Sequence, residues 1–402
     1  MSEKKHILLC VTGGIAVFKA AALTSKLTQD GYQVKVVMTE SAREFVTPLT
    51  FQALSREVVY ENTFYEPDPS SIAHIDIADW ADLVVIAPAT ANIIGKLAHG
   101  LADDMVSTTL LASTAPVMIA PAMNVHMYAH PAVTRNMAAL KEMGCEFIEP
   151  DEGYLACGYS GKGRMAEPED LHAMIDHHFI RRANPQWHGL KVLVTAGPTQ
   201  EKVDPVRFVS NRSSGKMGFA IAEEAAARGA DVTLIAGPVG LPDPHGVKRV
   251  DVTSAAEMYE QVHQYYGSQD VVIKAAAVSD YRPANVAEQK VKKSDDGWTL
   301  PLEQTADILQ SLGAAKKGQY LVGFAAESEH IEYYAKKKLR EKGLDLIAAN
   351  SIVAEGSGFD GDTNALMLYD RVGNEVEIRL TAKRAAAKQL LDAVQVRMGA
   401  EK

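Results

Sequence analysis

Two similar segments open the two halves of this chain, and each joins a short apolar strand to a glycine turn. Ile7–Gly14 reads ILLCVTGG, and Val192–Thr199 reads VLVTAGPT. An alanine-rich helical pattern follows each one, directly at 15–27 and after an insertion at 218–228. A strand that feeds a helix through a glycine turn presents free backbone N–H groups, which bind anions such as phosphate. The sequence therefore predicts two nucleotide- or cofactor-binding units in tandem.

The composition limits the class of protein. A length of 402 residues predicts two or three domains. The net charge of −10 argues against a general nucleic-acid coat or an anionic membrane surface as partner. Three cysteines (Cys10, Cys145 and Cys157) cannot form a disulfide framework. The sequence contains no uninterrupted run of about 18 apolar residues, so no membrane span is expected. We expect a cytoplasmic protein.

Strand and helix patterns alternate through the first half, which predicts a parallel, doubly wound sheet. A segment with four glycines, Gly153 to Gly163, follows these patterns, and we expect it to be a mobile flap. Polar residues and helix breakers at 181–189 place the domain junction there, with domains at 1–189 and 190–402. The expected strands are 7–11, 33–38, 83–87, 117–120 and 146–148, and the expected helices are 91–98, 103–112, 133–143 and 168–182.

The second half predicts another sheet of the same type, so the fold class is α/β with two doubly wound, Rossmann-like domains in tandem. A hairpin of 365–369 and 376–380 and a last helix at 381–397 complete it. The other expected strands are 191–195, 231–235, 271–275, 320–324 and 344–348, and the other expected helices are 216–228, 255–266, 306–315 and 331–342.

Two polar loops follow predicted strands of the first half. Pro88–Asn92 reads PATAN, and Pro121–Asn124 reads PAMN. Ligands of open parallel sheets bind beyond the carboxyl ends of strands, so both loops are expected in one crevice. The Asn124 amide can donate and accept, which suits a carboxylate, although either asparagine could simply cap a helix. Thr12–Ala16 lacks the GxGxxG spacing, which leaves a mononucleotide phosphate pocket or an ordinary tight turn.

Two further residues of the first half have chemistry to offer. His74 lies among apolar residues; an imidazole is the natural general base near neutral pH, but a lone histidine is more often structural. Cys157 lies inside the glycine-rich segment, where a thiol can donate a proton once water is excluded. The alternative is an incidental cysteine in an interdomain loop.

Together these motifs resemble the flavin-containing cysteine decarboxylases over the whole first half, most closely those acting on phosphopantothenoylcysteine. The resemblance implies a flavodoxin-like fold and an FMN that transiently oxidises CH2–SH, so that the carbanion left by CO2 is stabilised as an ene-thiolate. It implies His74 as the base region, Asn124 as the carboxylate ligand and Cys157 as the proton donor. It also implies a trimer with FMN between subunits. The implied cofactor residues are Gly13, Gly14, Ser41, Thr90, Asn92 and Met123, and the implied flap residues are Gly158, Arg164 and Met165.

A long polar turn, 197–218, follows the first strand of the second half. Its Gly215-Lys216 pair lacks P-loop spacing because Met217 follows the lysine. What remains is a serine- and glycine-rich helix N-terminus, which suits an anion, or a helix cap made by Ser213 or Ser214. Basic residues also cluster at 290–293 and 336–342, in the half that carries Asp280. Such clusters are often solvated surface, but here they also suit a triphosphate with a divalent metal.

Residues 190–400 resemble the phosphopantothenate–cysteine ligases, which implies CTP, Mg²⁺ and an acyl-cytidylate that cysteine converts to an amide. The resemblance implies that Lys290 steadies charge during activation and that Asn211 orients the acyl-cytidylate. Two departures from the family pattern are Ser279 and Thr305-Ala306. The implied CTP residues are Lys274, Ala275, Ala276, Asp280, Lys290, Ala306, Asp307, Ile308, Leu309, Phe324, Lys338 and Lys342.

These interpretations combine into one hypothesis: a bifunctional enzyme of coenzyme A biosynthesis. The second half would join cysteine to 4′-phosphopantothenate, and the first half would decarboxylate the product to 4′-phosphopantetheine. We expect a homo-oligomer with trimeric flavin domains and dimeric ligase domains, compatible with a dodecamer, and no nucleic-acid or membrane partner. A tandem nicotinamide-dependent oxidoreductase is the first alternative, but it predicts a dinucleotide fingerprint that neither opening has. A non-catalytic regulatory flavoprotein is the second, but it predicts loss of His74, Asn124 and Cys157, which are all present.

Overall fold

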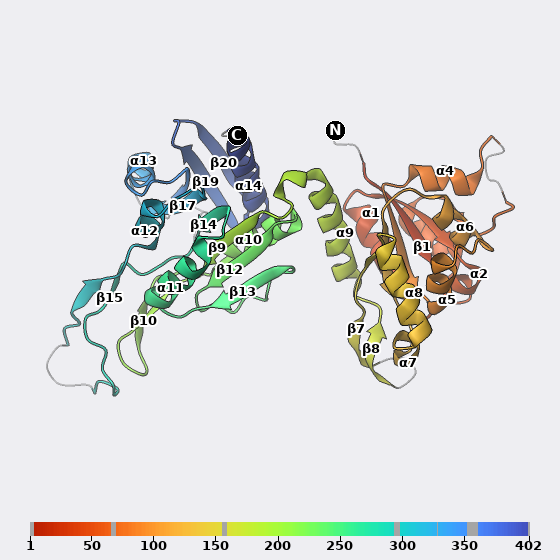
Figure 1. Ribbon diagram of the computed structural model, residues 1–402, viewed down its shortest axis with the longest axis horizontal. Coiled ribbons are helices and arrows are strands. Elements are labelled where there is room, and N and C mark those ends of the chain that lie inside the picture. The colour runs from red at the N-terminus through yellow and green to blue at the C-terminus, as the bar shows by residue number, and fades with distance from the viewer. Residues whose placement is uncertain are drawn as a thin grey trace. The chain divides into compact units, whose positions relative to one another are not determined.

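The computed structural model describes residues 4–65, 70–154, 159–292, 298–327, 329–351 and 361–400. Contacts divide the chain into two compact units, Met1–Asp176 and His177–Lys402. Figure 1 traces both units by residue number. None of the helices in the described ranges is both long and apolar enough to cross a membrane.

A six-stranded parallel sheet forms the centre of the first unit, in the order β3-β2-β1-β4-β5-β6. Without the two-residue edge strand β3, this order is the flavodoxin-like 2-1-3-4-5 arrangement. The strands are nearly continuous apolar runs because helices cover both faces. They are β1 (His6–Val11), β2 (Gln33–Met38), β3 (Val59–Tyr60), β4 (Leu83–Ala89), β5 (Val117–Pro121) and β6 (Glu146–Phe147).

Successive side chains of β1 point to opposite faces of this sheet. Leu8 and Cys10 join one core cluster with side chains of α4, α5, α6 and α8, while α1 and α3 contact the sheet separately. Helix α1 buries Ala20, Leu23 and Leu27, a spacing that keeps one helical stripe on the sheet. The helices are α1 (Val17–Gln29), α2 (Glu40–Arg43), α3 (Pro48–Ser55), α4 (Ala73–Trp80), α5 (Ala91–Ala98), α6 (Met105–Ala112), α7 (Val125–Tyr128), α8 (Pro131–Glu142) and α9 (Pro168–Ala183).

The glycine-rich segment after β6, which the sequence predicted to be a mobile flap, contains a hairpin. Strand β7 (Asp151–Tyr154) pairs antiparallel with β8 (Ser160–Arg164). Gly161 and Gly163 have φ values of 151° and 149°, which L side chains rarely adopt, so the glycines permit the paired backbone. Strand periodicity could not reveal this hairpin, since glycine carries no apolar side chain. Cys157 and Gly158 lie outside the described residues.

The second unit contains an eight-stranded sheet in the order β13-β12-β9-β14-β17-β18-β19-β20. The first six strands in this order, from β13 through β9 to β18, are parallel to one another. Strands β19 and β20 pair antiparallel with their neighbours. The six parallel strands follow the Rossmann order 3-2-1-4-5-6. They are β9 (Lys191–Ala196), β12 (Asp231–Ala236), β13 (Val247–Asp251), β14 (Val271–Lys274), β17 (Tyr320–Glu327) and β18 (Leu346–Ser351), followed by β19 (Thr363–Asp370) and β20 (Glu375–Ala382).

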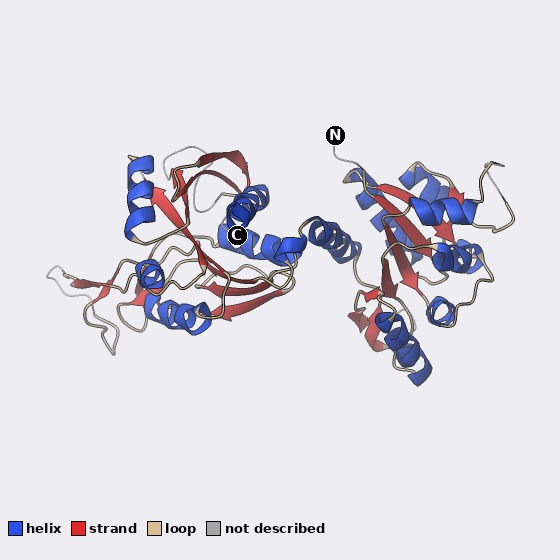
Figure 2. Cartoon of the chain, turned by 45° about the horizontal axis from the view of Figure 1, so that its top comes forward, coloured by secondary structure: helices blue, strands red, loops and turns tan. Residues whose placement is uncertain are grey.

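Helices cover both faces of this second sheet, as Figure 2 shows. One core cluster unites the sheet with α10 and α14, and the other unites it with α11, α12 and α13. Two small hairpins, β10 (Gln200–Lys202) with β11 (Phe208–Ser210) and β15 (Tyr281–Pro283) with β16 (Leu302–Gln304), extend from it. The helices are α10 (Lys216–Ala227), α11 (Ala255–Tyr266), α12 (Ile308–Ala314), α13 (Ile331–Glu341), α14 (Lys383–Ala400) and the 3₁₀ turn η1 (Pro185–Trp187).

Candidate active sites

A cavity of about 470 Å³ lies at the carboxyl ends of β1, β4 and β5 in the first unit. The glycine turn after β1, the two polar loops and the foot of β8 form its wall, so the two loops converge as expected. Apolar side chains dominate the lining, which suits a flat aromatic ring system. The lining residues are Gly13, Gly14, Ile15, Ala16, Phe18, Lys19, Thr90, Ala91, Ala122, Met123, Asn124, Met127, Gly163, Arg164 and Met165.

Short-range contacts fix the turn at this cavity. The Thr12 hydroxyl donates to the Pro88 carbonyl at 2.7 Å and lies 3.2 Å from the Thr90 amide, which joins the ends of β1 and β4. A side chain on Gly13 would overlap Ser41, whereas the Cβ position of Gly14 faces open space. Helix α1 begins without a side-chain cap and without an acidic residue in its first turn. The Val17 and Lys19 amides donate to the Gly14 and Ala16 carbonyls at 3.0 Å, so this N-terminus offers a phosphate group the helix dipole and the remaining amides of the first turn.

The β7–β8 hairpin is held over the Asn124 loop. The Met123 amide donates to the Gly163 carbonyl at 3.0 Å, and a Cβ on Gly163 would overlap the Met123 carbonyl oxygen. The buried Lys19 ammonium donates to the Met165 carbonyl at 2.6 Å and lies 3.1 Å from a Glu167 carboxylate oxygen. These contacts bring helix α1, the β5 loop and β8 to one cavity.

The structure separates some predicted residues from this cavity. Ser41 and Asn92 are exposed and do not line it, and neither does His74. Helix α4, which carries His74, and helix α7, beside the cavity, lie apart within the unit (Figure 1). The buried Nδ1 atom of His74 has no hydrogen-bond partner within the described residues. Asn124 also caps α7, since its Oδ1 accepts from the His126 amide at 2.8 Å.

Two adjoining cavities lie beyond the carboxyl ends of β14, β17 and β18 in the second unit. The larger, of about 430 Å³, follows the 304–310 segment, and the other, of about 300 Å³, follows the start of α10. They share Lys274, Val278, Asp280 and Lys342. Every predicted CTP residue except Lys290 lines one of the two, and Asn211 lines the second.

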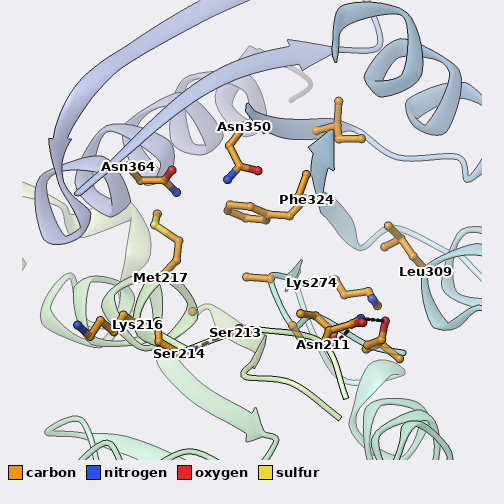
Figure 3. Close-up of a pocket in the computed structure, with 18 of the residues that line it drawn as sticks. Asn211, Ser213, Ser214, Lys216, Met217, Lys274, Leu309, Phe324, Asn350 and Asn364 are labelled. Carbon is orange, nitrogen blue, oxygen red and sulfur yellow. Dashed lines mark hydrogen bonds between the residues drawn. The ribbon is translucent and has the colours of Figure 1, made fainter. Parts of the chain in front are cut away.

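The loops that form these cavities are joined by hydrogen bonds. The Ser279 amide donates to the Thr199 hydroxyl at 2.9 Å, and the Thr305 hydroxyl donates to the Ser279 carbonyl at 2.6 Å. The two departures from the ligase pattern, Ser279 and Thr305, therefore contact each other. The Asn211 amide donates to the Val278 carbonyl at 3.1 Å, which orients it toward the loop after β14 (Figure 3).

Charged groups of both signs meet at these cavities. Lys338 lies 2.7 Å from Glu327, and Lys342 lies 2.8 Å from Asp307. Burial acts to raise the pKa of Asp307, but the hydrogen bonds from Lys342 and from the Gln310 amide outweigh it and lower the pKa. The uncapped N-terminus of α10 adds a partial positive charge at the other end of the cavity. Such a distribution suits a polyanion. Across the described ranges, no group of three or more acidic, histidine or cysteine side chains is placed to hold a metal.

Lys290 lies apart from the cavities, on an exposed segment. Asp204 fixes this segment, because its carboxylate accepts from the Val291 amide at 3.2 Å and from Arg207 at 2.9 Å. Three polar residues that the sequence did not predict also line the α10 cavity: Asn350, Asn364 and Lys383. Asn350 could have been found, since it follows an apolar run at the end of β18; the other two begin elements whose proximity is purely tertiary.

Comparisons with known proteins assign both halves to families. Residues 1–180 match the family described as Flavoprotein, and residues 187–397 match the "DNA/pantothenate metabolism flavoprotein C-terminal domain".

Two relatives align along nearly their whole length. The "Coenzyme A biosynthesis bifunctional protein CoaBC" of Bacillus subtilis (strain 168) is 56% identical over 395 residues, covering 98% of this chain and 97% of the relative. The protein of the same name from Escherichia coli (strain K12) is 45% identical over 397 residues, covering 98% and 97%. A crystal structure of the C-terminal domain of a protein of that name is 45% identical, with a TM-score of 0.46, and covers 53% of this chain and 97% of that one. The chain therefore belongs to the family of coenzyme A biosynthesis bifunctional proteins.

Proposed function

We propose that this chain carries out two sequential steps of coenzyme A biosynthesis, one in each unit. Its family makes it a bifunctional enzyme with a flavin-dependent decarboxylase half and a ligase half. The second unit would join cysteine to 4′-phosphopantothenate with CTP, and the first would convert the product to 4′-phosphopantetheine. The paired cavities at the carboxyl ends of β14, β17 and β18 carry this proposal, because cations, amides and an uncapped helix meet there.

In the ligase unit, the substrate carboxylate would attack the α-phosphate of CTP, releasing pyrophosphate and forming an acyl-cytidylate. Lys338, Lys342 and Lys274 would lie against the phosphates, and Phe324 would pack on the nucleoside. Asn211 would orient the acyl-cytidylate for attack by the cysteine amine, which displaces CMP. Lys290 would reach the site only by movement of the segment that Asp204 holds. Mg²⁺ would be bound chiefly by phosphate oxygens, since the described side chains offer no ligand cluster.

In the decarboxylase unit, the residues present fit FMN. Gly13 and Gly14 with the start of α1 would bind its phosphate, and Thr90 and Met123 would contact the rest of the cofactor. When bound, FMN supplies reversible two-electron oxidation of the substrate CH2–SH group. Asn124 would hold the substrate carboxylate, while Arg164 and Met165, at the foot of the hairpin, would close over it. The proton at the reacting carbon would come from Cys157.

We further propose that this site is completed by a second subunit. Asn92 is exposed, and the buried Nδ1 atom of His74, which has no partner among the described residues, does not line its own chain's cavity. A symmetric trimer would bring these two residues of one subunit to the FMN of the next, whereas Ser41, which lies against Gly13, would stay beside the cofactor turn of its own chain. Dimerisation of ligase units would then build a larger assembly, and we place the protein in the cytoplasm.

Two measurements test the assignment. The purified protein should absorb near the visible flavin bands, and it should release pyrophosphate only when CTP, a divalent cation and phosphopantothenate are all supplied. Chelation of the metal should stop pyrophosphate release and leave the flavin spectrum unchanged. A colourless protein that is inert toward CTP would refute both assignments.

A further inference from the structure

Five lysines line the ligase cavities: Lys216, Lys274, Lys338, Lys342 and Lys383. Three of them are paired with carboxylates, Lys216 with Asp362 at 2.6 Å, Lys338 with Glu327 at 2.7 Å and Lys342 with Asp307 at 2.8 Å. Lys383 lies in the electrostatic field of Asp362. For the Lys274 ammonium, no acceptor or carboxylate lies within hydrogen-bonding or ion-pairing distance among the parts of the chain that the structure describes. Among these five lysines, Lys274 is thus the one whose charge is available to a ligand within the described ranges.

The position of Lys274 gives it access to both cavities. It is the last residue of β14, a central strand between β9 and β17, and it lines the wall that the two cavities share. Figure 3 shows it on the side of the pocket where Asn211 and Leu309 lie, away from Lys216 and Asn364. A nucleotide extending from one cavity to the other would therefore pass Lys274.

The surroundings of Lys274 lower its pKa, so its charge depends on the pH of the solution. Burial and the positive charge of Lys342 lower the pKa of Lys274 to about 8, and Lys338 acts in the same direction. Asp307, at the start of α12, and Asp280, in the loop after β14, oppose this shift without cancelling it. Near pH 8 the side chain is therefore about half protonated before any ligand binds.

We propose that nucleoside triphosphate binding in this site is coupled to protonation of Lys274, whose amine takes one proton from solvent and becomes the ammonium that contacts the phosphates. This inference rests on the proposed nucleotide site. A polyanion beside an amine stabilises the ammonium form, so protonation and nucleotide binding must favour each other reciprocally. Lys338 and Lys342 differ from Lys274 in having carboxylate partners, Glu327 and Asp307.

The coupling has a defined size. Proton uptake per bound CTP should rise with pH between pH 7 and 9, because the unprotonated fraction of Lys274 passes through one half near pH 8. The affinity for CTP should fall with rising pH above 8, by up to about tenfold per unit. The phosphates of CTP are already ionised in this range, since their last pKa is about 6.

Isothermal titration calorimetry of the full chain tests the proposal. CTP with Mg²⁺ is titrated at pH 8, without cysteine or phosphopantothenate, in buffers of different ionisation enthalpy. The apparent enthalpy should change with buffer enthalpy by a slope equivalent to about half a proton. Lys274→Met should abolish the slope and weaken binding. Lys274→Arg, always charged, should abolish the slope while retaining affinity. Lys248→Met, at an exposed lysine on β13, is the matched control and should retain the slope.

Each result decides one question. Tight CTP binding without proton uptake, or uptake that survives in Lys274→Met, would overturn the role of Lys274 and leave the nucleotide site intact. A chain that does not bind CTP in any buffer would overturn the nucleotide site and the coupling together. If Lys274→Met does not fold, the comparison of the wild type with Lys274→Arg gives the same decision.

Discussion

Buried and half-buried cations in this molecule are stabilised in different ways, and the difference separates structural from ligand-binding roles. Lys19 donates to a carbonyl of the hairpin foot, and Arg228, only 1% exposed, contacts two carboxylates. Within the ranges that the structure describes, Lys274 has neither kind of partner, and its pKa is lowered to about 8. A side chain that costs folding energy when charged, at the mouth of the proposed nucleotide site, is typical of function rather than of stability.

The substitution Lys274→Met should raise thermal stability at neutral pH in the absence of nucleotide. The pKa of Lys274 is lowered on folding, so the unfolded chain binds more protons between about pH 8 and 10.5, and wild-type stability rises with pH across that window. The stability advantage of Lys274→Met should therefore be largest below pH 8 and shrink toward pH 10. Melting temperatures measured from pH 7 to 10, relative to Lys248→Met, check this; a pH-independent difference would contradict it.

At the scale of elements, one face of the second sheet depends on the contact between α10 and α14. Arg228, the C-cap of α10, lies 3.0 Å from Glu224 and 2.7 Å from Asp392 of α14. Its guanidinium also donates to the Lys388 carbonyl at 2.9 Å. Arg228 thereby connects two helices that are far apart in sequence.

Arg228→Met should destabilise the second unit by about 3–5 kcal/mol, because it leaves the buried Glu224 carboxylate without its partner. The double variant Glu224→Gln/Arg228→Met should recover part of that loss. Scanning calorimetry measures both, using the transition that CTP shifts to identify the second unit. Equal destabilisation by the single and double variants would show that the ion pair is not the cause.

A second prediction at this scale concerns the β7–β8 hairpin. Gly163→Ala places a Cβ against the Met123 carbonyl at a φ of 149°. Strain of about 1–3 kcal/mol would weaken FMN retention by about 5- to 150-fold. Gly95→Ala, in α5, is the matched control and should retain FMN, because a Cβ there would make only an ordinary van der Waals contact with Asn136 Nδ2 at 3.7 Å. The ratio of flavin to protein absorbance measures retention, and pyrophosphate release should be unchanged in both variants.

At the scale of the whole molecule, the junction between the two activities lies within residues that pack on the second unit. Trp187 is 1% exposed in the core of that unit, and its indole N–H donates to Gln395 at 2.7 Å. Contacts divide the chain after Asp176, whereas the sequence predicted the domain junction at 181–189 and domains at 1–189 and 190–402, which stay predictions. Helix breakers in the sequence mark where the chain changes direction, but they do not indicate which of the two hydrophobic cores Trp187 packs into.

A fragment of residues 177–402 should therefore be more stable than a fragment of 190–402. Loss of Trp187 from the core should cost about 3–5 kcal/mol, comparable to a tryptophan-to-alanine change. Urea midpoints of the two purified fragments measure the difference, and pyrophosphate release checks that both keep the ligase site. Equal midpoints would mean that Trp187 does not stabilise the second unit.

Most long elements followed from periodicity, and the family resemblance is confirmed by the comparisons. The expected strand 33–38 and helix 255–266 match β2 and α11. The misses include α3, α4 and the edge strand β13, which is only partly buried. Length alone does not separate them, because α5 and α6 also have eight residues each and were expected. The missed elements are stabilised by docking, so local pattern does not announce them. Helix α12 begins at Ile308 rather than 306, because Asp307 caps it.

The sequence by itself determined the two parallel sheets, the glycine turns and the residue types at each strand end, since these depend on local periodicity and backbone sterics. Only the tertiary structure decided which of those residues share a cavity, because proximity across β14, α12 and α13 depends on strand order and helix packing. In the tertiary structure Lys274, Asp307 and Lys342 line the same cavity, and Lys290 does not line it. His74 does not line the cavity of the first unit in its own chain. The charge state of Lys274 likewise arises from burial and neighbours that no linear pattern specifies.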